Sequence, residues 1–142
     1  MSEIGIVREF EIRGGDFAVG GEVASQLKHM LQQIGVPGAS VRRMAICCYE
    51  AEMNVIIHAY HGRITATIYP DRIQIIVEDV GPGIPDIELA MQEGYSTAPD
   101  YVREMGFGAG MGLPNMARCA DEFAIESQVG VGTKIKLVIR YK

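Results

Sequence analysis

The sequence predicts an α+β fold, a two-layer sandwich in which helices cover one face of a mixed, mostly antiparallel sheet. The β-rich segments after the first occur in adjacent pairs, which is typical of hairpins and therefore of antiparallel strands. Three helical segments must then share one face of the sheet. A chain of 142 residues has the usual size of one domain, so we expect a single domain over residues 1–142.

The first 60 residues predict one strand and two helices. Apolar and polar residues alternate over residues 4–12, which indicates a strand. Asp16 is placed to cap a helix from residue 17 to about 34, and Ser40 to cap a longer helix from 41 to about 60. The first helix has an apolar stripe made of Val23, Leu27, Met30, Leu31 and Ile34.

The segments after residue 60 predict, in order, a hairpin, a short helix, an irregular stretch, another helix and a second hairpin. The first hairpin pairs residues 63–69 with 72–80, and the short helix covers 86–92. The irregular stretch covers 94–110 and the next helix 113–120. The second hairpin pairs 122–128 with 133–141. An irregular stretch as long as 94–110 is unusual in a small domain unless it is functional.

Composition excludes several classes of protein. The chain has 13 basic and 18 acidic residues, a net charge of −5, and no basic run, so we expect no nucleic-acid partner. No apolar stretch approaches the ~18 residues of a membrane span, and the first residues do not form a signal peptide. The odd number of cysteines, Cys47, Cys48 and Cys119, favours a reducing compartment and buried thiols rather than a metal site. We therefore expect a cytoplasmic protein.

A row of polar residues occurs on the second, otherwise apolar helix. Glu50, Asn54 and His58 follow one another at four-residue steps, so they share one face. The row can be a solvated stripe. A carboxylate and an amide one turn apart can also serve an attacking hydroxyl and a magnesium ion, because Mg²⁺ prefers oxygen ligands.

A second motif, Asp79-Val80-Gly81-Pro82-Gly83, follows the first predicted hairpin. A carboxylate there could accept a hydrogen bond from an exocyclic amine, and the glycines would let backbone approach a flat ring. The same pattern also describes ordinary turns.

A third motif, residues 106–113, is glycine-rich and precedes a helix. Free amides at a helix start form an anion site, although a flexible linker has the same composition. A fourth, residues 130–133, ends in Thr133 and predicts by itself only a hairpin turn.

The order of these motifs resembles the Bergerat-fold (GHKL) ATP-binding domain of gyrase, Hsp90, histidine kinases and MutL. The resemblance runs from about Ser40 to the C-terminus. Residues 50–58 resemble the N-box, and residues 94–97 the start of an ATP lid at about 94–110. Residues 110–114 with 121–123 are similar to the small bacterial serine/threonine kinases that act as anti-sigma factors or stressosome switch kinases.

The resemblance implies ATP and Mg²⁺ as cofactors and gives each motif a role. Glu50 would be the general base for a serine hydroxyl, and Asn54 would ligate magnesium. Asp79 would accept from the adenine amino group, supported by Thr133. The remaining nucleotide-binding positions are Gly81 and Gly83 at the adenine, and Gly108, Gly110, Met111 and Gly112 at the phosphates.

The implied function is that of an ATP-dependent protein serine/threonine kinase that phosphorylates a serine of a STAS-type anti-sigma antagonist. The alternative is an ATP-binding module that sequesters a sigma factor or another regulator without phosphotransfer. Autophosphorylation on histidine is not expected, because His29 and His58 lie within the predicted fold. The apolar residues near the N-terminus could serve a homodimer, but core packing is the simpler use for them. Glu52 should face away from Asn54 and be exposed.

Overall fold

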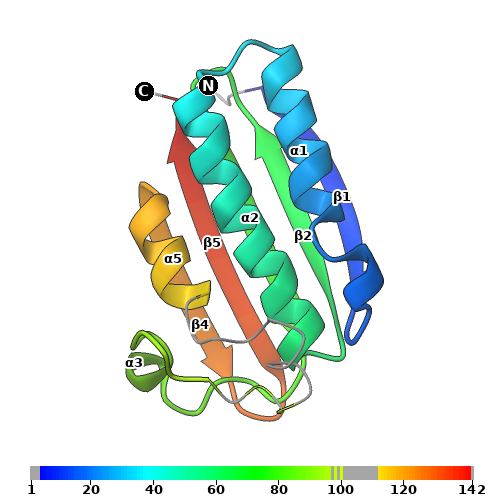
Figure 1. Cartoon of the computed structure of the whole chain (residues 1–142), viewed down its shortest axis with the longest axis vertical. Coiled ribbons are helices and arrows are strands. Elements are labelled where there is room, and N and C mark those ends of the chain that lie inside the picture. The colour runs from blue at the N-terminus through cyan, green and yellow to red at the C-terminus, as the bar shows by residue number, and fades with distance from the viewer. Residues whose placement is uncertain (1–3, 97, 99, 101–111, 142) are drawn as a thin grey trace.

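A five-stranded sheet forms one layer of the part of the chain that the structure describes (Figure 1). The structure is a computed structural model that describes residues 4–96, 98, 100 and 112–141. The strands are β1 (Ile6–Arg13), β2 (His61–Ile68), β3 (Arg72–Val80), β4 (Glu122–Gln128) and β5 (Gly132–Arg140). They lie in the order β1-β2-β3-β5-β4, and each neighbouring pair is antiparallel.

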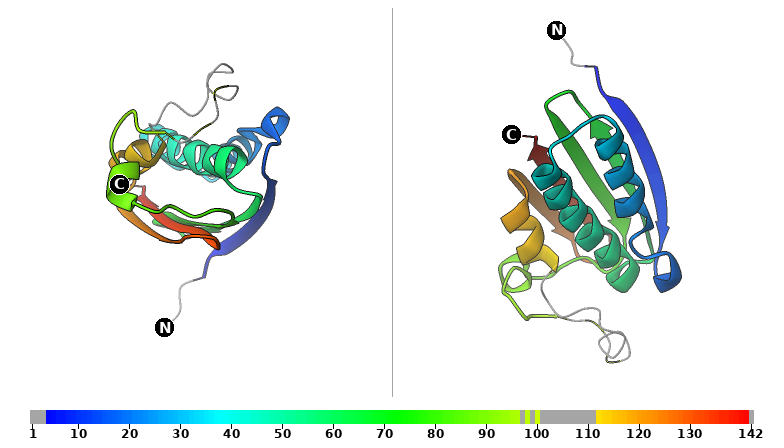
Figure 2. Two further views of the ribbon diagram at one scale, coloured as in Figure 1. Left: turned by 90° about the horizontal axis from the view of Figure 1, so that it is seen from below. Right: turned by 45° about the horizontal axis from the view of Figure 1, so that its top comes forward.

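Helices cover one face of this sheet, as the edge-on view in Figure 2 shows. The covering helices are α1 (Glu22–Gln33), α2 (Gly38–His58) and α5 (Gly112–Cys119). The 3₁₀ turn η1 (Phe17–Val19) precedes α1, and the short α3 (Ile87–Ala90) follows β3. The prediction of a two-layer α+β sandwich is confirmed. Over the described residues, no helix has the length and apolar character required to cross a membrane.

The core lies between α2 and the central strands. Alternate residues of β2, β3 and β5 are buried, as expected for strands covered on one face. Cys47 and Cys48 of α2 are buried among them as predicted, and Cys119 is half-buried; all three are free thiols. Burial raises the pKa of Cys47 to about 12, so its thiol stays protonated at neutral pH. Leu27 and Leu31 of α1 are fully buried, which confirms core packing for them. Core packing is wrong for Ile4 and Ile6 near the N-terminus, which are 89% and 47% exposed.

Two predicted helix starts are wrong. The helix expected from residue 17 is interrupted by Gly20 and Gly21, and Asp16 caps nothing with its side chain. Gly21 has φ of +93°, a conformation that a helix interior does not allow, so α1 begins only after it. Ser40 is not the N-cap of α2, because that helix already begins at Gly38. Its hydroxyl instead donates to the carbonyl of Tyr141 at 2.9 Å, which ties α2 to the end of the sheet.

The expectation that Glu52 is exposed is also wrong. Its side chain is 2% exposed and caps the start of α1 from the neighbouring helix. One carboxylate oxygen accepts from the amides of Gly21 at 3.1 Å and Val23 at 3.3 Å, and the other from that of Ala24 at 3.3 Å. Because Gly21 has no side chain with which to cap α1, an acceptor must come from elsewhere in the chain. Burial raises the pKa of Glu52, and these backbone hydrogen bonds partly offset the rise.

We expect Glu52→Ala to destabilise the fold by about 2–4 kcal/mol, because three amides lose their acceptor and a cavity opens. Urea unfolding followed by circular dichroism measures the change. The matched control is Glu22→Ala, which removes an exposed glutamate from the first turn of α1. It should cost less than about 1 kcal/mol. Equal losses in the two variants would contradict the capping role.

The stability that Glu52 contributes should also fall as the pH rises. Its pKa in the folded chain lies above the ordinary value of about 4.3, so the folded state holds the proton more tightly than the unfolded state. The contribution is complete below about pH 4.3 and is lost as the pH rises through the folded-state pKa. The stability of the wild type relative to Glu52→Gln should therefore decline over this window and then level off. A relative stability that rises over the same window would show that hydrogen bonding outweighs burial.

Candidate functional site

The predicted site residues that the structure describes lie towards one end of the molecule, where α2 and β3 end and where β5 and α5 begin (Figure 1). Antiparallel pairing of β3 with β5 produces this arrangement, because the last residues of β3 lie beside the first residues of β5. Tyr60, just after α2, donates its amide to the Val80 carbonyl at 2.9 Å, which brings the end of α2 to the same place.

Asp79 joins β3 to β5. Its Oδ1 accepts a hydrogen bond from the Thr133 amide at 3.0 Å, and Thr133 is buried. Within the described part of the chain, the other oxygen, Oδ2, accepts no hydrogen bond. Burial raises the pKa of Asp79, whereas the Thr133 amide and the nearby His61 lower it. The backbone thus fixes the carboxyl group and leaves one of its oxygens for a ligand that donates an N–H.

Glycines allow the backbone to close around Asp79. A Cβ at Gly132 would lie 2.0 Å from the Asp79 carbonyl oxygen, and one at Gly81 would lie 3.0 Å from the Cα of Ala59. Gly83 has φ of +75°, and a Cβ there would lie 2.4 Å from the Gln128 carbonyl oxygen. Only glycine permits the approaches at positions 132 and 83, and the contact at position 81 is tight. A place for Gly81 and Gly83 at an adenine pocket stays a prediction.

Ser127 is a residue that the sequence prediction missed. Its Oγ accepts from the Ile84 amide at 2.7 Å and lies 3.0 Å from the Gly132 carbonyl oxygen and 2.8 Å from Thr133 Oγ1. A hydroxyl has one proton and two lone pairs. The Ser127 hydroxyl donates its proton to the Gly132 carbonyl and accepts from the Ile84 amide and the Thr133 hydroxyl, so its proton and both lone pairs are used. Ser127 therefore holds the loop after β3 against the β4–β5 hairpin. The sequence could have indicated this role, because Ser127 lies on the same face of β4 as the apolar residues Phe123 and Ile125.

The polar row on α2 faces away from the core. Glu50, Asn54 and His58 are each half-buried. Burial raises the pKa of Glu50, and a hydrogen bond from Asn115 lowers it. Among described residues, the side chain of Asn54 has no hydrogen-bond partner. Burial lowers the pKa of His58, so its imidazole is neutral at pH 7.

The start of α5 lies against Glu50. Asn115, a second residue that the prediction missed, donates its side-chain amide to Glu50 Oε2 at 3.4 Å. A Cβ at Gly112 would lie 3.4 Å from the same oxygen. Gly112 is therefore beside the predicted base, as a phosphate-binding position would require. Gly108, Gly110 and Met111, with most of the predicted lid, lie outside the described residues.

Hard oxygen ligands are few in this region. In the part of the chain that the structure describes, no group of three or more His, Cys, Asp or Glu side chains could hold a metal ion. A magnesium ion bound through Asn54 would thus need most of its ligands from phosphate oxygens and water.

Comparison with known proteins identifies the family. Residues 18–139 match the family model described as the histidine kinase-like ATPase domain. The chain belongs to this family. The resemblance to the Bergerat-fold ATP-binding domain is thereby confirmed, and it extends closer to the N-terminus than the sequence motifs alone indicated.

Within this family, the chain is similar in sequence to a serine/threonine-protein kinase and to anti-sigma factors. The serine/threonine-protein kinase RsbT of Bacillus subtilis (strain 168) is 33% identical over 115 residues, which cover 78% of this chain and 80% of RsbT. The anti-sigma F factor of Caldanaerobacter subterraneus subsp. tengcongensis is 40% identical over 93 residues, 62% of each chain. The match thus spans less than two thirds of that anti-sigma factor.

A solved structure supports the fold. A chain in the crystal structure of the SiaB–SiaC complex from Pseudomonas aeruginosa superposes with a TM-score of 0.64. The two chains are 13% identical, and the match covers 93% of this chain and 88% of the other. At that identity the likeness shows a shared fold and nothing more.

Gly83 and Gly130 have similar backbone conformations, so a comparison of their alanine variants tests the close contact between the loop after β3 and the β4–β5 hairpin. A Cβ added at Gly130, which has φ of +79°, would have nothing within 4 Å of it, whereas one added at Gly83 would meet the Gln128 carbonyl. Gly130→Ala should cost about 1–2 kcal/mol from backbone strain alone. Gly83→Ala should cost about 1–3 kcal/mol more, because the hairpin must move. Thermal unfolding of both variants measures the difference, and equal costs would mean that the loop and hairpin do not need this contact.

Proposed function

We propose that this protein is an ATP-dependent protein serine/threonine kinase that acts as an anti-sigma regulatory factor or switch kinase. Its substrate would be a serine of a STAS-type antagonist protein. One observation carries the proposal: Asp79, with an open carboxylate oxygen, lies at the same end of the fold as Glu50, Asn54 and the start of α5. Membership of the histidine kinase-like ATPase domain family and the similarity to RsbT support it.

The chemistry at Asp79 fits adenine. Oδ1 is held by the Thr133 amide, and the exocyclic amine of adenine is a suitable donor to Oδ2. The buried Thr133 keeps the carboxylate in place through its backbone, so the acceptor does not need to reorganise when a nucleotide binds. Gly81 and Gly83 have no side chains that would obstruct the approach of a flat base to this carboxylate.

The chemistry at Asn54 fits magnesium held between phosphates. Its amide oxygen is a hard ligand with no competing partner among the residues described, and it lies one helical turn from Glu50. Bound Mg²⁺ would supply neutralisation of the phosphate charge that develops during transfer. Gly112, at the start of α5, is where unpaired helix amides could meet an anion.

Glu50 is suited to take a proton from the attacking hydroxyl. Burial raises its pKa towards neutrality, which makes its carboxylate a stronger base than an exposed one. Asn115 holds Oε2, which leaves Oε1 to accept the proton. The serine oxygen then forms a bond to the γ-phosphorus as the bond to the ADP oxygen breaks, and the proton moves to Glu50.

The proposed setting is the cytoplasm, with the antagonist protein as substrate and a sigma factor as a second partner. Because the core uses Leu27 and Leu31, a homodimer formed by the apolar N-terminal residues would use the edge strand β1 and the exposed Ile4 and Ile6. The competing function is an ATP-binding module that captures a sigma factor or another regulator without transferring phosphate.

Calorimetric titration with ATP, with and without magnesium, tests the nucleotide site first. Wild type should bind ATP in a magnesium-dependent manner, and Asn54→Ala should lose that dependence because the proposed protein ligand to the ion is gone. Glu22→Gln, on the exposed side of α1, is the control and should match wild type. The proposal fails if folded wild type does not bind ATP at all.

Glu50→Gln tests the base. Incubation with γ-labelled ATP and purified STAS-domain proteins of the same genome should label one of them with wild type. Glu50→Gln should reduce the transfer rate by at least about 100-fold while ATP affinity changes by less than about threefold, because the amide keeps the shape but cannot take the proton. Transfer at the wild-type rate would refute the role of Glu50. ATP and partner binding without any transfer by wild type would establish the capture module instead.

A further inference from the structure

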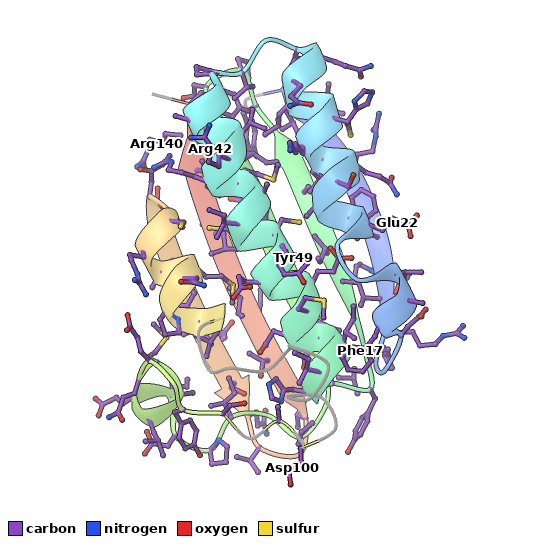
Figure 3. All side chains as sticks on the ribbon, in the orientation of Figure 1. Phe17, Glu22, Arg42, Tyr49, Asp100 and Arg140 are labelled. Atoms are coloured by element: carbon purple, nitrogen blue, oxygen red, sulfur yellow. The ribbon has the colours of Figure 1, made fainter. Side chains whose placement is uncertain are left out.

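A groove of about 510 Å³ lies between α1 and α2, apart from the nucleotide residues. Lys28 lines it from α1, and Arg42, Ala45, Ile46 and Tyr49 line it from α2. Figure 3 shows Arg42 and Tyr49 on the helix that crosses the middle of the sheet, with Tyr49 towards α1. Glu50, the proposed base, stands at the rim of the same groove.

The groove exposes apolar side chains that the core does not use. Ile46 is 39% exposed and Tyr49 is 36% exposed, although both belong to the helix that carries much of the core. A Cβ on Gly21 would lie 3.3 Å from the Tyr49 ring, so the ring rests on the start of α1 next to the residues that Glu52 caps. Fixed aromatic and aliphatic side chains beside cations are typical of the central residues of protein interfaces.

The cations of the groove are available to a partner. Lys28 and Arg42 are exposed and form no ion pair with any described residue. The adjacent Arg43 differs, because it pairs with Asp121 at 2.8 Å and also donates to the Arg140 carbonyl. Two such cations around an apolar centre, on a chain with a net charge of −5, complement a partner that presents carboxylates around an apolar side chain.

The groove is continuous with the proposed catalytic row. Arg42, Ile46 and Glu50 follow one another at four-residue steps, so each lies about 6 Å along the helix from the next. A protein that brings a hydroxyl to Glu50 along this groove therefore covers Ile46, one turn away. The nucleotide residues lie beyond Glu50 in the other direction, towards Asn54 and the end of α2.

We propose that the α1–α2 groove is the docking surface for the protein substrate, and that it takes an acidic segment with an apolar residue at its centre, next to the acceptor serine. The proposal rests on the proposed kinase function. Lys28 and Arg42 receive the carboxylates, and Ile46 and Tyr49 receive the apolar side chain. Docking there sets the distance from the acceptor hydroxyl to Glu50, so the groove determines which serine is presented.

The test uses the full chain carrying Glu50→Gln, saturated with magnesium and ATP, and the same purified STAS-domain proteins as probes. Binding is measured by biolayer interferometry, which does not require phosphotransfer. Arg42→Glu and Ile46→Asp, each added to this chain, should weaken binding of the STAS-domain protein by at least about 10-fold. Calorimetry should give them the same ATP affinity as the parent chain, which also shows that they fold.

Matched controls lie away from the groove. Lys136→Glu reverses a charge on the open face of the sheet, and Val129→Asp adds one at the exposed β4–β5 turn. Both should bind the STAS-domain protein as the parent does. In the Glu50-containing enzyme, Arg42→Glu should raise KM for the protein substrate at least about 10-fold and leave kcat within about twofold, because docking and transfer are separate.

The outcomes separate this proposal from the kinase function. If wild type labels a STAS-domain protein but Arg42→Glu and Ile46→Asp bind it as the parent does, docking in the groove is overturned and the kinase stands. If the two variants lose binding although wild type transfers no phosphate, the groove stands and the kinase is overturned. If no STAS-domain protein binds the parent chain at all, both are overturned.

Discussion

The hydrogen bond from the Thr133 amide to the Asp79 carboxylate is the contact on which the site end of this protein depends. It joins the end of the β2–β3 hairpin to the first residues of β5, and the glycines at 81, 83 and 132 allow the backbone to close tightly around it. Ser127 then locks the same junction from β4. The result is a carboxylate whose position is fixed by backbone before any ligand arrives, which is the form of preorganisation that recognition of a base requires.

Helix α2 serves three purposes at once. One face supplies the centre of the core, and the opposite face carries the row from Glu50 to His58. A third direction is used by Glu52, which caps α1 and so places that helix relative to the row. This division explains why the hydrophobic pattern of α2 is less regular than that of a helix lying on a protein surface.

The sequence predicted what depends on neighbours along the chain. The two hairpins, the one-sided helical layer and the polar row follow from periodicity and turn residues, which are local properties. The wrong helix start at residue 17 has a local cause, the pair Gly20 and Gly21. The other errors and omissions share a different cause. Four residues form hydrogen bonds to a segment that is distant in sequence or across a turn: Glu52, Ser40, Ser127 and Asn115. The spacing of residues in a helix or strand indicates the face on which such a residue lies. It does not indicate which segment of the chain packs against that face. The places of Gly108, Gly110 and Met111, outside the described residues, remain predictions from the motif.

The order of the strands has a consequence for how the protein folds. β2 pairs with β3, and β4 with β5, across short turns, whereas β3 and β5 are distant in sequence and must close a long loop before they pair. Asp79 is on β3 and Thr133 is on β5, so their hydrogen bond forms only after this slow, non-local pairing. The proposed nucleotide site is thus assembled only once β3 has paired with β5. A nucleotide that binds there recognises the folded chain and not its hairpins, so cellular nucleotide would act by mass action as a stabiliser of the finished fold.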